Sequence, residues 1–262
     1  MSGARVALHP TAQVDPAARL GDGTSVAAFS VIGADVSLGP GCEVGPHAVI
    51  EGPTVMGARC KVFPFACVGM APQDLKYRGE RTTIEIGDNN IFREGVTVHR
   101  GTQGGGGVTR IGSGNLLMAQ THIAHDCQVG SGAIFANAAT LAGHVVVEDN
   151  ATIGAFSGVH QFCRVGEHAY IGGYSVITQD ALPFVLTVGN RAKSFGINVV
   201  GLERKNFPPE SIQALRQAYR ILFRSKLNLD QALDRLQNEL AGQKEVARMA
   251  AFIRGSKRGV IR

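Results

Sequence analysis

Tryptophan is absent from this chain of 262 residues, and aromatic residues make up only 6% of it. No apolar run approaches the roughly 20 residues that a membrane-spanning helix needs. The five cysteines form no Cys-X-X-Cys pair, which argues against a zinc ribbon or a disulfide framework. The amino terminus lacks a charged segment followed by an apolar run and a cleavage site, so we expect a cytoplasmic protein without an integral membrane segment.

What the chain does contain is an aliphatic or other large apolar residue at every sixth position. The period is interrupted twice, near residues 69–85 and 102–110, and resumes each time. Its members are Leu8, Val14, Leu20, Val26, Ile32, Leu38, Val44, Ile50, Met56, Val62 and Val68, then Ile86, Phe92 and Val98, then Ile111, Leu117, Ile123, Val129, Phe135, Leu141, Val147, Ile153, Val159, Val165, Ile171 and Ile177.

The fifth residue of each hexad is small or β-branched almost throughout, which confirms the period independently. Four cysteines (Cys42, Cys60, Cys127 and Cys163) take this position, and we predict that they are buried packing residues. A period of six fits neither an α-helix nor an alternating strand, whereas short strands joined by tight turns return a side chain inward every six residues. Residues 1–189 are therefore predicted to form a parallel β-helix, with three hexads in each coil and about 4.8 Å between coils.

The two interruptions are predicted to be external loops. The first carries proline, several charges and Tyr77, and it preserves the phase of the repeat. The second adds seven residues to one hexad and includes Gly104 to Gly107, which indicates a mobile excursion from the coil. A phosphate-cradling loop is a sharper alternative, although no helix start and no Lys-Ser/Thr pair follow it.

After residue 189 the hexads end and helical patterns begin. Apolar residues recur at helical spacing in residues 208–225 and 227–241, so residues 190–262 are predicted to form a small helical domain. This segment holds 15 lysines and arginines against six acidic residues, a net charge of +9, whereas residues 1–189 have a net charge of −4. The charge favours an acidic protein partner over nucleic acid, because aromatic residues for stacking are few and no recognition motif is present.

The histidines carry the chemistry. None of the eight falls on an inward position of its hexad, so all are expected to face outward. In a coil of 18 residues, Gly143 stacks on His125 and His144 stacks on Asp126. A base, a carboxylate to orient it and a backbone N–H for an oxyanion then meet in one place, which is the outline of an acyl-transfer site.

Two alternatives remain open at this point. In γ-type carbonic anhydrases, which are also hexapeptide β-helices, three histidines hold zinc, and His122, His125 and His144 are candidate ligands. A purely structural β-helix is the other alternative, but it has no need for clustered outward histidines. Metal analysis would separate the two enzymatic hypotheses.

Six segments resemble the UDP-N-acetylglucosamine O-acyltransferase family of lipid A synthesis. They are QDLKYRGE at 73–80, TVHRGT at 97–102, QTHIAHDC at 120–127, ATLAGHV at 139–145, HQFC at 160–163 and RGVIR at the end of the chain. The resemblance implies a left-handed β-helix, a homotrimer with active sites between subunits, and transfer of a 3-hydroxyacyl group to the sugar 3-hydroxyl. The related N-acyltransferase of the same pathway is the alternative. It normally carries an additional amino-terminal domain before the hexads, and because the period here starts at Leu8 we expect the O-acyltransferase.

The resemblance also implies residue roles. His125 is the general base, Asp126 orients it, and the N–H of Gly143 stabilises the oxyanion. Asp74 and Lys76 are expected to contact the sugar nucleotide. The implied substrate-binding set as a whole is Gln73, Asp74, Lys76, His99, His122, His144, His160, Gln161, Asn198 and Arg204.

Acyl-chain length is expected to depend on Gly173, which in the family leaves a hydrocarbon groove open for a long chain. The chain departs from familiar members at Arg191, where histidine is often found, and at Val200, where glutamate is expected. The donor implied is an acyl carrier protein, a small acidic partner expected to dock on the basic region 190–262. No cofactor and no metal ion are expected.

Overall fold

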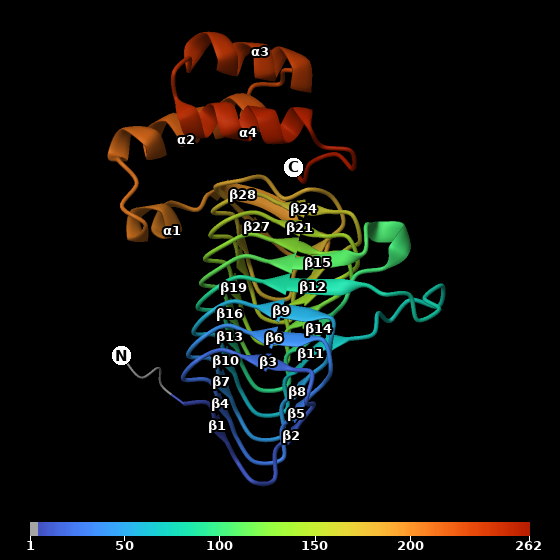
Figure 1. Cartoon of the computed structure of the whole chain (residues 1–262). Helices are drawn as coiled ribbons and strands as arrows, with labels where there is room; N and C mark the ends of the chain where they lie inside the picture. Colours follow the sequence, from blue (N-terminus) through green and yellow to red (C-terminus); the bar gives the residue numbers. More distant parts are fainter. Residues whose placement is uncertain (1–4) are drawn as a thin grey trace.

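The computed structural model describes residues 5–262 and consists of a long triangular prism of stacked coils beneath a helical cap (Figure 1). Three sheets, parallel except for the last strand of the first, form the sides of the prism, and nearly every coil contributes one short strand to each sheet. We name the sheets A, B and C. The turns between them are the AB, BC and CA corners, in the order in which the chain passes through them.

The strands of each sheet follow one another along the prism. Sheet A runs through β1 (Ala7–Leu8), β4 (Ser25–Val26), β7 (Glu43–Val44), β10 (Lys61–Val62), β13 (Ile91–Phe92), β16 (Leu116–Leu117), β19 (Ile134–Phe135), β22 (Thr152–Ile153), β25 (Tyr170–Ile171), β27 (Val185–Val188) and β28 (Lys193–Ile197). Sheet B runs through β2 (Gln13–Val14), β5 (Val31–Ile32), β8 (Val49–Ile50), β11 (Cys67–Met70), β14 (Thr97–His99), β17 (His122–Ile123), β20 (Thr140–Leu141), β23 (Gly158–Val159) and β26 (Val176–Ile177). Sheet C runs through β3 (Arg19–Leu20), β6 (Val36–Leu38), β9 (Thr54–Met56), β12 (Thr83–Ile86), β15 (Val108–Ile111), β18 (Gln128–Val129), β21 (Val146–Val147) and β24 (Arg164–Val165).

The register confirms a coil of 18 residues. Ile123 in β17 pairs with Leu141 in β20, and Val129 in β18 pairs with Val147 in β21. The two interruptions leave the coil without disturbing the inward ladder, because Val68 still pairs with Val98 and Val98 with Ile123. Both excursions project from the same side of the prism (Figure 1).

The hexad residues form one continuous core inside the prism. From Val26 to Ile177, the large apolar residue of almost every hexad is no more than 5% exposed. Burial of each such side chain contributes roughly 1.5–3 kcal/mol before the opposing chain entropy. Four cysteines (Cys42, Cys60, Cys127 and Cys163) are buried in this core as free thiols, as predicted, and Cys67 is half-buried.

The helical cap comprises α1 (Val199–Arg204), α2 (Pro209–Arg224), α3 (Leu229–Glu239) and α4 (Lys244–Arg254). These helices share a second apolar core, to which Leu182, Phe184 and Val185 at the end of the prism also belong. The chain then returns to the prism, where Ile261 is buried in the first core. The sequence predicted the helices α2 and α3 but neither α1 nor α4.

The segment after residue 189 is not helical from its start. Strand β28 lies there and pairs antiparallel with β27, and the first helix begins only at Val199. This strand escaped sequence analysis because an antiparallel partner at the end of the prism needs no hexad period. Among residues 5–262, no helix combines the length and apolar character required to cross a membrane.

Candidate active site

The BC corner gathers both external loops and the turns that carry the predicted catalytic residues. The loop at 71–82 joins β11 to β12, and the segment at 100–107 joins β14 to β15. The turns at 124–127, 142–145 and 160–163 follow in the next three coils of the same corner. Because each corner is a column of stacked turns, residues far apart in sequence become neighbours there.

His125 and Asp126 form a hydrogen-bonded pair at this corner. Nδ1 of His125 lies 2.8 Å from Oδ2 of Asp126. The Asp126 side chain is wholly buried, whereas 16% of the His125 side chain is exposed. Because an ionised carboxylate can only accept, Nδ1 carries the proton of the neutral ring and Nε2 is left as an acceptor. The imidazole can therefore take a proton from a substrate at Nε2.

Asp126 and His144 occupy the same turn position in successive coils. Both have left-handed backbone conformations, with φ of 61° and 62°, which aspartate and histidine adopt more readily than most residues. The backbone N–H of Asp126 donates to Oγ1 of Thr109 at 2.8 Å, and that of His144 donates to the carbonyl of His125 at 3.1 Å. The turn backbone thus holds both side chains in place.

Gly143 lies directly over the His125 ring, as the coil period predicted. A Cβ atom at position 143 would be 2.6 Å from Cε1 of His125 and 2.9 Å from its Nε2, so only glycine fits without displacing the ring. The N–H of Gly143 donates to no group within residues 5–262. It is available to a bound oxygen beside the imidazole.

His144 completes the group of rings. It is stacked on Phe162, with centroids 4.5 Å apart, and meets His125 edge-on at 5.2 Å. Burial lowers the pKa of His144, and the negative charges of Asp126 and Asp74 partly oppose this effect. Asp74 belongs to the loop at 71–82, which leaves the prism at this same corner.

Facing outward does not expose every histidine. His99 is only 5% exposed, and burial, followed by the nearby His122, lowers its pKa to about 4. The two rings meet edge-on with centroids 4.9 Å apart. Nδ1 of His122 lies 2.7 Å from Oγ1 of Thr97, and burial lowers the pKa of His122 as well. Both rings are therefore neutral at pH 7.

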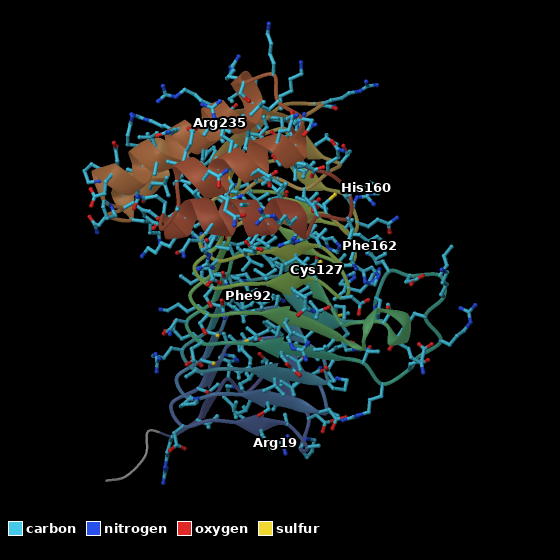
Figure 2. The ribbon with its side chains drawn as sticks, turned by 90° about the horizontal axis from the view of Figure 1, so that it is seen from above. Arg19, Phe92, Cys127, His160, Phe162 and Arg235 are labelled. Atoms are coloured by element: carbon cyan, nitrogen blue, oxygen red, sulfur yellow. The ribbon has the colours of Figure 1, made fainter. Side chains whose placement is uncertain are left out.

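The remaining predicted residues of the BC corner are polar and accessible. His160 and Gln161 are exposed, and Figure 2 shows His160 on the side where the loops project. Three further residues, Gln73, Asp74 and Lys76, lie on the loop at 71–82, where Oδ1 of Asp74 accepts the backbone N–H of Lys76 at 2.9 Å.

Sequence reasoning assigned no role to Arg100, which anchors this loop. Its side chain is 11% exposed. It donates to the carbonyl of Gly52 at 2.9 Å, to the carbonyl of Gly69, and to the Tyr77 hydroxyl at 3.3 Å. Arg100 belongs to the TVHRGT segment, which resembles the family and could have drawn attention to it. No sequence pattern near Arg100, however, predicts its contact with Tyr77.

Four other predicted residues lie at different corners of the same chain. Gly173 is in the AB corner, and the turn carrying Arg191 rests there too, since the carbonyl of Gly189 accepts the N–H of Val176. Asn198 caps α1 and donates to the carbonyl of His168 in the CA corner at 3.0 Å. Arg204 is the exposed last residue of α1. A single chain does not bring these four residues to His125.

The zinc hypothesis requires His122, His125 and His144 to converge. Within residues 5–262, the group whose ligand atoms lie within 4.8 Å of one another is instead His125, Asp126 and His144. Oδ2 of Asp126 is already engaged by His125, and Nδ1 of His122 is engaged by Thr97. The arrangement is that of a proton-transfer pair rather than a three-histidine metal centre.

A groove of about 1050 Å³ lies away from this cluster, between the outer face of sheet C and α4. Arg110, Arg164 and Arg248 line it together with Glu85 and Glu148, so its charges are largely paired. None of the predicted catalytic residues lines it. The candidate active site is therefore the BC corner, where the histidine–carboxylate pair lies, and not this groove.

The stacked hexads place the chain among the hexapeptide-repeat transferases, and a histidine–carboxylate pair under a glycine amide is suited to acyl transfer. The model of bacterial transferase hexapeptide repeats matches residues 17–52 and 144–179, and that of UDP-N-acetylglucosamine O-acyltransferase domain 2 matches residues 180–261. The chain belongs to the UDP-N-acetylglucosamine O-acyltransferase family. The prism is accordingly a left-handed β-helix, as predicted, against the usual right-handed crossover.

The relatives cover nearly the whole chain. The acyl-[acyl-carrier-protein]–UDP-N-acetylglucosamine O-acyltransferase of Alkalilimnicola ehrlichii is 53% identical over 97% of this chain and 99% of its own length. That of Herminiimonas arsenicoxydans is 50% identical with the same coverage. The solved UDP-N-acetylglucosamine acyltransferases of Moraxella catarrhalis and Bacteroides fragilis are 41% and 39% identical, with TM-scores of 0.94 and 0.95, each over 97% of this chain and 99% of the other.

Proposed function

We propose that this protein transfers a 3-hydroxyacyl group from acyl carrier protein to the 3-hydroxyl of UDP-N-acetylglucosamine, the first step of lipid A biosynthesis. The observation that carries the proposal is the His125–Asp126 pair beneath the backbone of Gly143. The relatives are named for O-acyl transfer, which favours it over both N-acyl transfer and carbonic anhydrase chemistry.

The chemistry follows from three groups. Nε2 of His125 takes the proton of the sugar hydroxyl as the oxygen attacks the thioester carbon. Asp126 stabilises the imidazolium that forms, and the N–H of Gly143 stabilises the oxyanion on the former carbonyl oxygen. When the tetrahedral intermediate collapses, the C–S bond breaks and the imidazolium returns its proton to the thiolate. The products are the ester and the free carrier thiol, and no cofactor or metal takes part.

The acceptor is held by the loop at 71–82 and the neighbouring rings. The ammonium of Lys76 suits phosphate or hydroxyl oxygens, and Asp74 suits sugar hydroxyls. The rings of His99 and His122 are neutral, so neither adds a positive charge that would compete with His125 for Asp126. The exposed His160 and Gln161 complete this contact set.

The site is proposed to be completed by a neighbouring subunit in a homotrimer. The residues expected to hold the nucleotide and the acyl chain, Asn198, Arg204, Gly173 and Arg191, lie at other corners of the same chain. A rotation that places one chain's BC corner against a neighbour's other corners would bring the two sets together. A cleft between subunits would also exclude water from the thioester, which the open corner of one chain does not.

The carrier protein is proposed to dock on α2. Arg216, Arg220 and Arg224 recur every four residues and are all exposed, so they form one basic stripe on this helix. Arg220 and Arg224 also line a groove of about 580 Å³ between α2 and α3. A small acidic partner complements such a surface. We further propose that the reaction takes place in the cytoplasm.

The test is an assay of the purified protein with UDP-N-acetylglucosamine and a panel of 3-hydroxyacyl carrier proteins, with the products weighed by mass spectrometry. We expect one O-acylated product, and we expect His125→Ala to lower kcat by about 10²–10⁴ because the base is lost. The variant should remain a trimer, since His125 lies outside the core. Near-normal turnover of His125→Ala, or an N-acylated product, would contradict the proposal.

A further inference from the structure

Thr102 holds the Asp126 carboxylate at both oxygens. The backbone N–H of Thr102 donates to Oδ1 at 2.9 Å, and its hydroxyl donates to Oδ2 at 2.6 Å. Both residues are buried, with Thr102 at 7% and Asp126 at 4% exposure. They are 24 positions apart and meet only because the segment at 100–107 folds across the BC corner.

The two hydrogen bonds restrict rotation of the carboxylate. Oδ2 also accepts from Nδ1 of His125 at 2.8 Å. Nε2 of His144 lies 3.9 Å from the same oxygen, so a rotated carboxylate could accept from His144 instead. A carboxylate fastened at one oxygen can turn about its Cβ–Cγ bond, whereas one fastened at both cannot. Thr102 thus keeps a lone pair of Oδ2 aimed at His125.

The glycine-rich segment closes over this arrangement. The carbonyl of Thr102 accepts the N–H groups of Gly105 and Gly107 at 3.0 and 2.8 Å, which folds the short 3₁₀ turn η1 (Gln103–Gly105) back onto Thr102. Gly105 lies so close to Asp126 that a Cβ atom there would overlap the carboxylate. The missing side chain at Gly105 therefore lets the backbone cover Asp126, whose side chain has no exposed surface.

We infer that Thr102 is a positioning residue of the acyl-transfer reaction, and that its hydroxyl sets the orientation of His125 through Asp126. The inference rests on the proposed role of His125 as the base. It also gives the segment at 102–110 a function, which is to support the carboxylate rather than to bind phosphate. Small misplacements of a catalytic group cost up to about 10²-fold in rate, so loss of the hydroxyl should be visible in kcat.

The experiment compares Thr102→Val with Thr102→Ser. Valine keeps the shape and the backbone donor but removes the hydroxyl, and we expect kcat to fall about 10- to 100-fold while KM for UDP-N-acetylglucosamine stays the same. Serine keeps the hydroxyl, and we expect it to retain most of the turnover. Thermal unfolding and the oligomeric state of both variants serve as the control for folding, and Thr102→Ala replaces Thr102→Val if the valine variant does not fold.

A second measurement asks whether Thr102 acts through Asp126. In an Asp126→Asn background the carboxylate is already lost, so adding Thr102→Val should lower kcat little further. Wild-type turnover of Thr102→Val, equal losses in the valine and serine variants, or a full additional loss in the Asp126→Asn background would each overturn the inference. The proposed function fails separately, by normal turnover of His125→Ala in a chain whose Thr102 is intact.

Discussion

The backbone of Gly143 lies directly above the imidazole of His125, one coil further along the prism, so closely that a methyl group at position 143 would fall 2.6 Å from Cε1. The base and the proposed oxyanion donor are therefore set by the strand spacing itself. No loop has to close to bring them together. The geometry follows from stacking turns of equal length.

Gly143→Ala should displace the His125 ring or the amide above it. We expect kcat to fall about 10²–10³-fold, the range associated with loss of an oxyanion donor. Gly158→Ala is the matched control, because a Cβ atom at position 158 meets no atom within 4 Å. Steady-state kinetics of both variants, with their melting temperatures, check the prediction. Similar kcat values for the two would contradict it.

The buried histidines should make the fold sensitive to acid. The pKa of His99 falls from 6.5 in the unfolded chain to about 4 in the folded one. Between these values the unfolded chain binds more protons, so stability is greatest above pH 6.5 and is lost as pH falls toward 4. For His99 alone the loss from pH 7 to pH 5 is about 2 kcal/mol.

Urea unfolding at pH 7 and pH 5 measures this loss. His99→Gln should reduce the difference between the two pH values, whereas His47→Gln, at an exposed position, should leave it unchanged. His122 and His144 also have lowered pKa values and add to the loss with the same sign. An equal pH dependence in the His99→Gln variant and the wild type would count against the burial of His99.

Docking of the carrier protein on α2 should depend on charge. We expect Arg220→Glu to raise KM for the acylated carrier about 10-fold, and rising ionic strength to raise the wild-type KM in the same direction. KM for UDP-N-acetylglucosamine should not change. Arg19→Glu, an exposed arginine near the opposite end of the prism (Figure 2), is the control. A KM for the carrier that stays flat with salt would rule out this docking surface.

Gly173→Met should shorten the preferred acyl chain. Gly173 is exposed at the AB corner, and a Cβ atom there would meet the carbonyl of Ala155 at 3.3 Å, so a side chain can be added only outward, over the surface. A long side chain would then occupy part of the proposed hydrocarbon groove. Competition among 3-hydroxyacyl carriers of different lengths, read by mass spectrometry, checks this. An unchanged distribution of acyl-chain lengths in the product would contradict the prediction that Gly173 lines the acyl-chain groove.

Contacts between residues one coil apart could be predicted from the chain alone, because the period of six makes every coil equivalent. This is how Gly143 over His125 and the buried cysteines were predicted. Contacts made by the external loops could not be predicted in this way. The hydrogen bonds from Thr102 to Asp126 and from Arg100 to Tyr77 join residues whose separation in the sequence is not set by the repeat.

The burial of His99 and the strand at Lys193–Ile197 likewise could not be predicted from the hexad period. The position of a residue in its hexad predicts that its side chain points outward. Whether that side chain is buried depends on other segments of the chain that pack over it. Likewise, β28 exists because β27 offers an unpaired edge at the end of the prism.

The amino-acid sequence by itself determined the prism, its 18-residue coil, the inward ladders and the alignment of His125 with Gly143, because side-chain burial and strand spacing are periodic and local. Only the tertiary structure decided which groups hold Asp126, which histidine is buried, and which corner carries each substrate-binding residue. These depend on where non-repeating segments fold across the coils. That choice is governed by the sum of many hydrogen bonds and packing contacts rather than by any pattern along the chain.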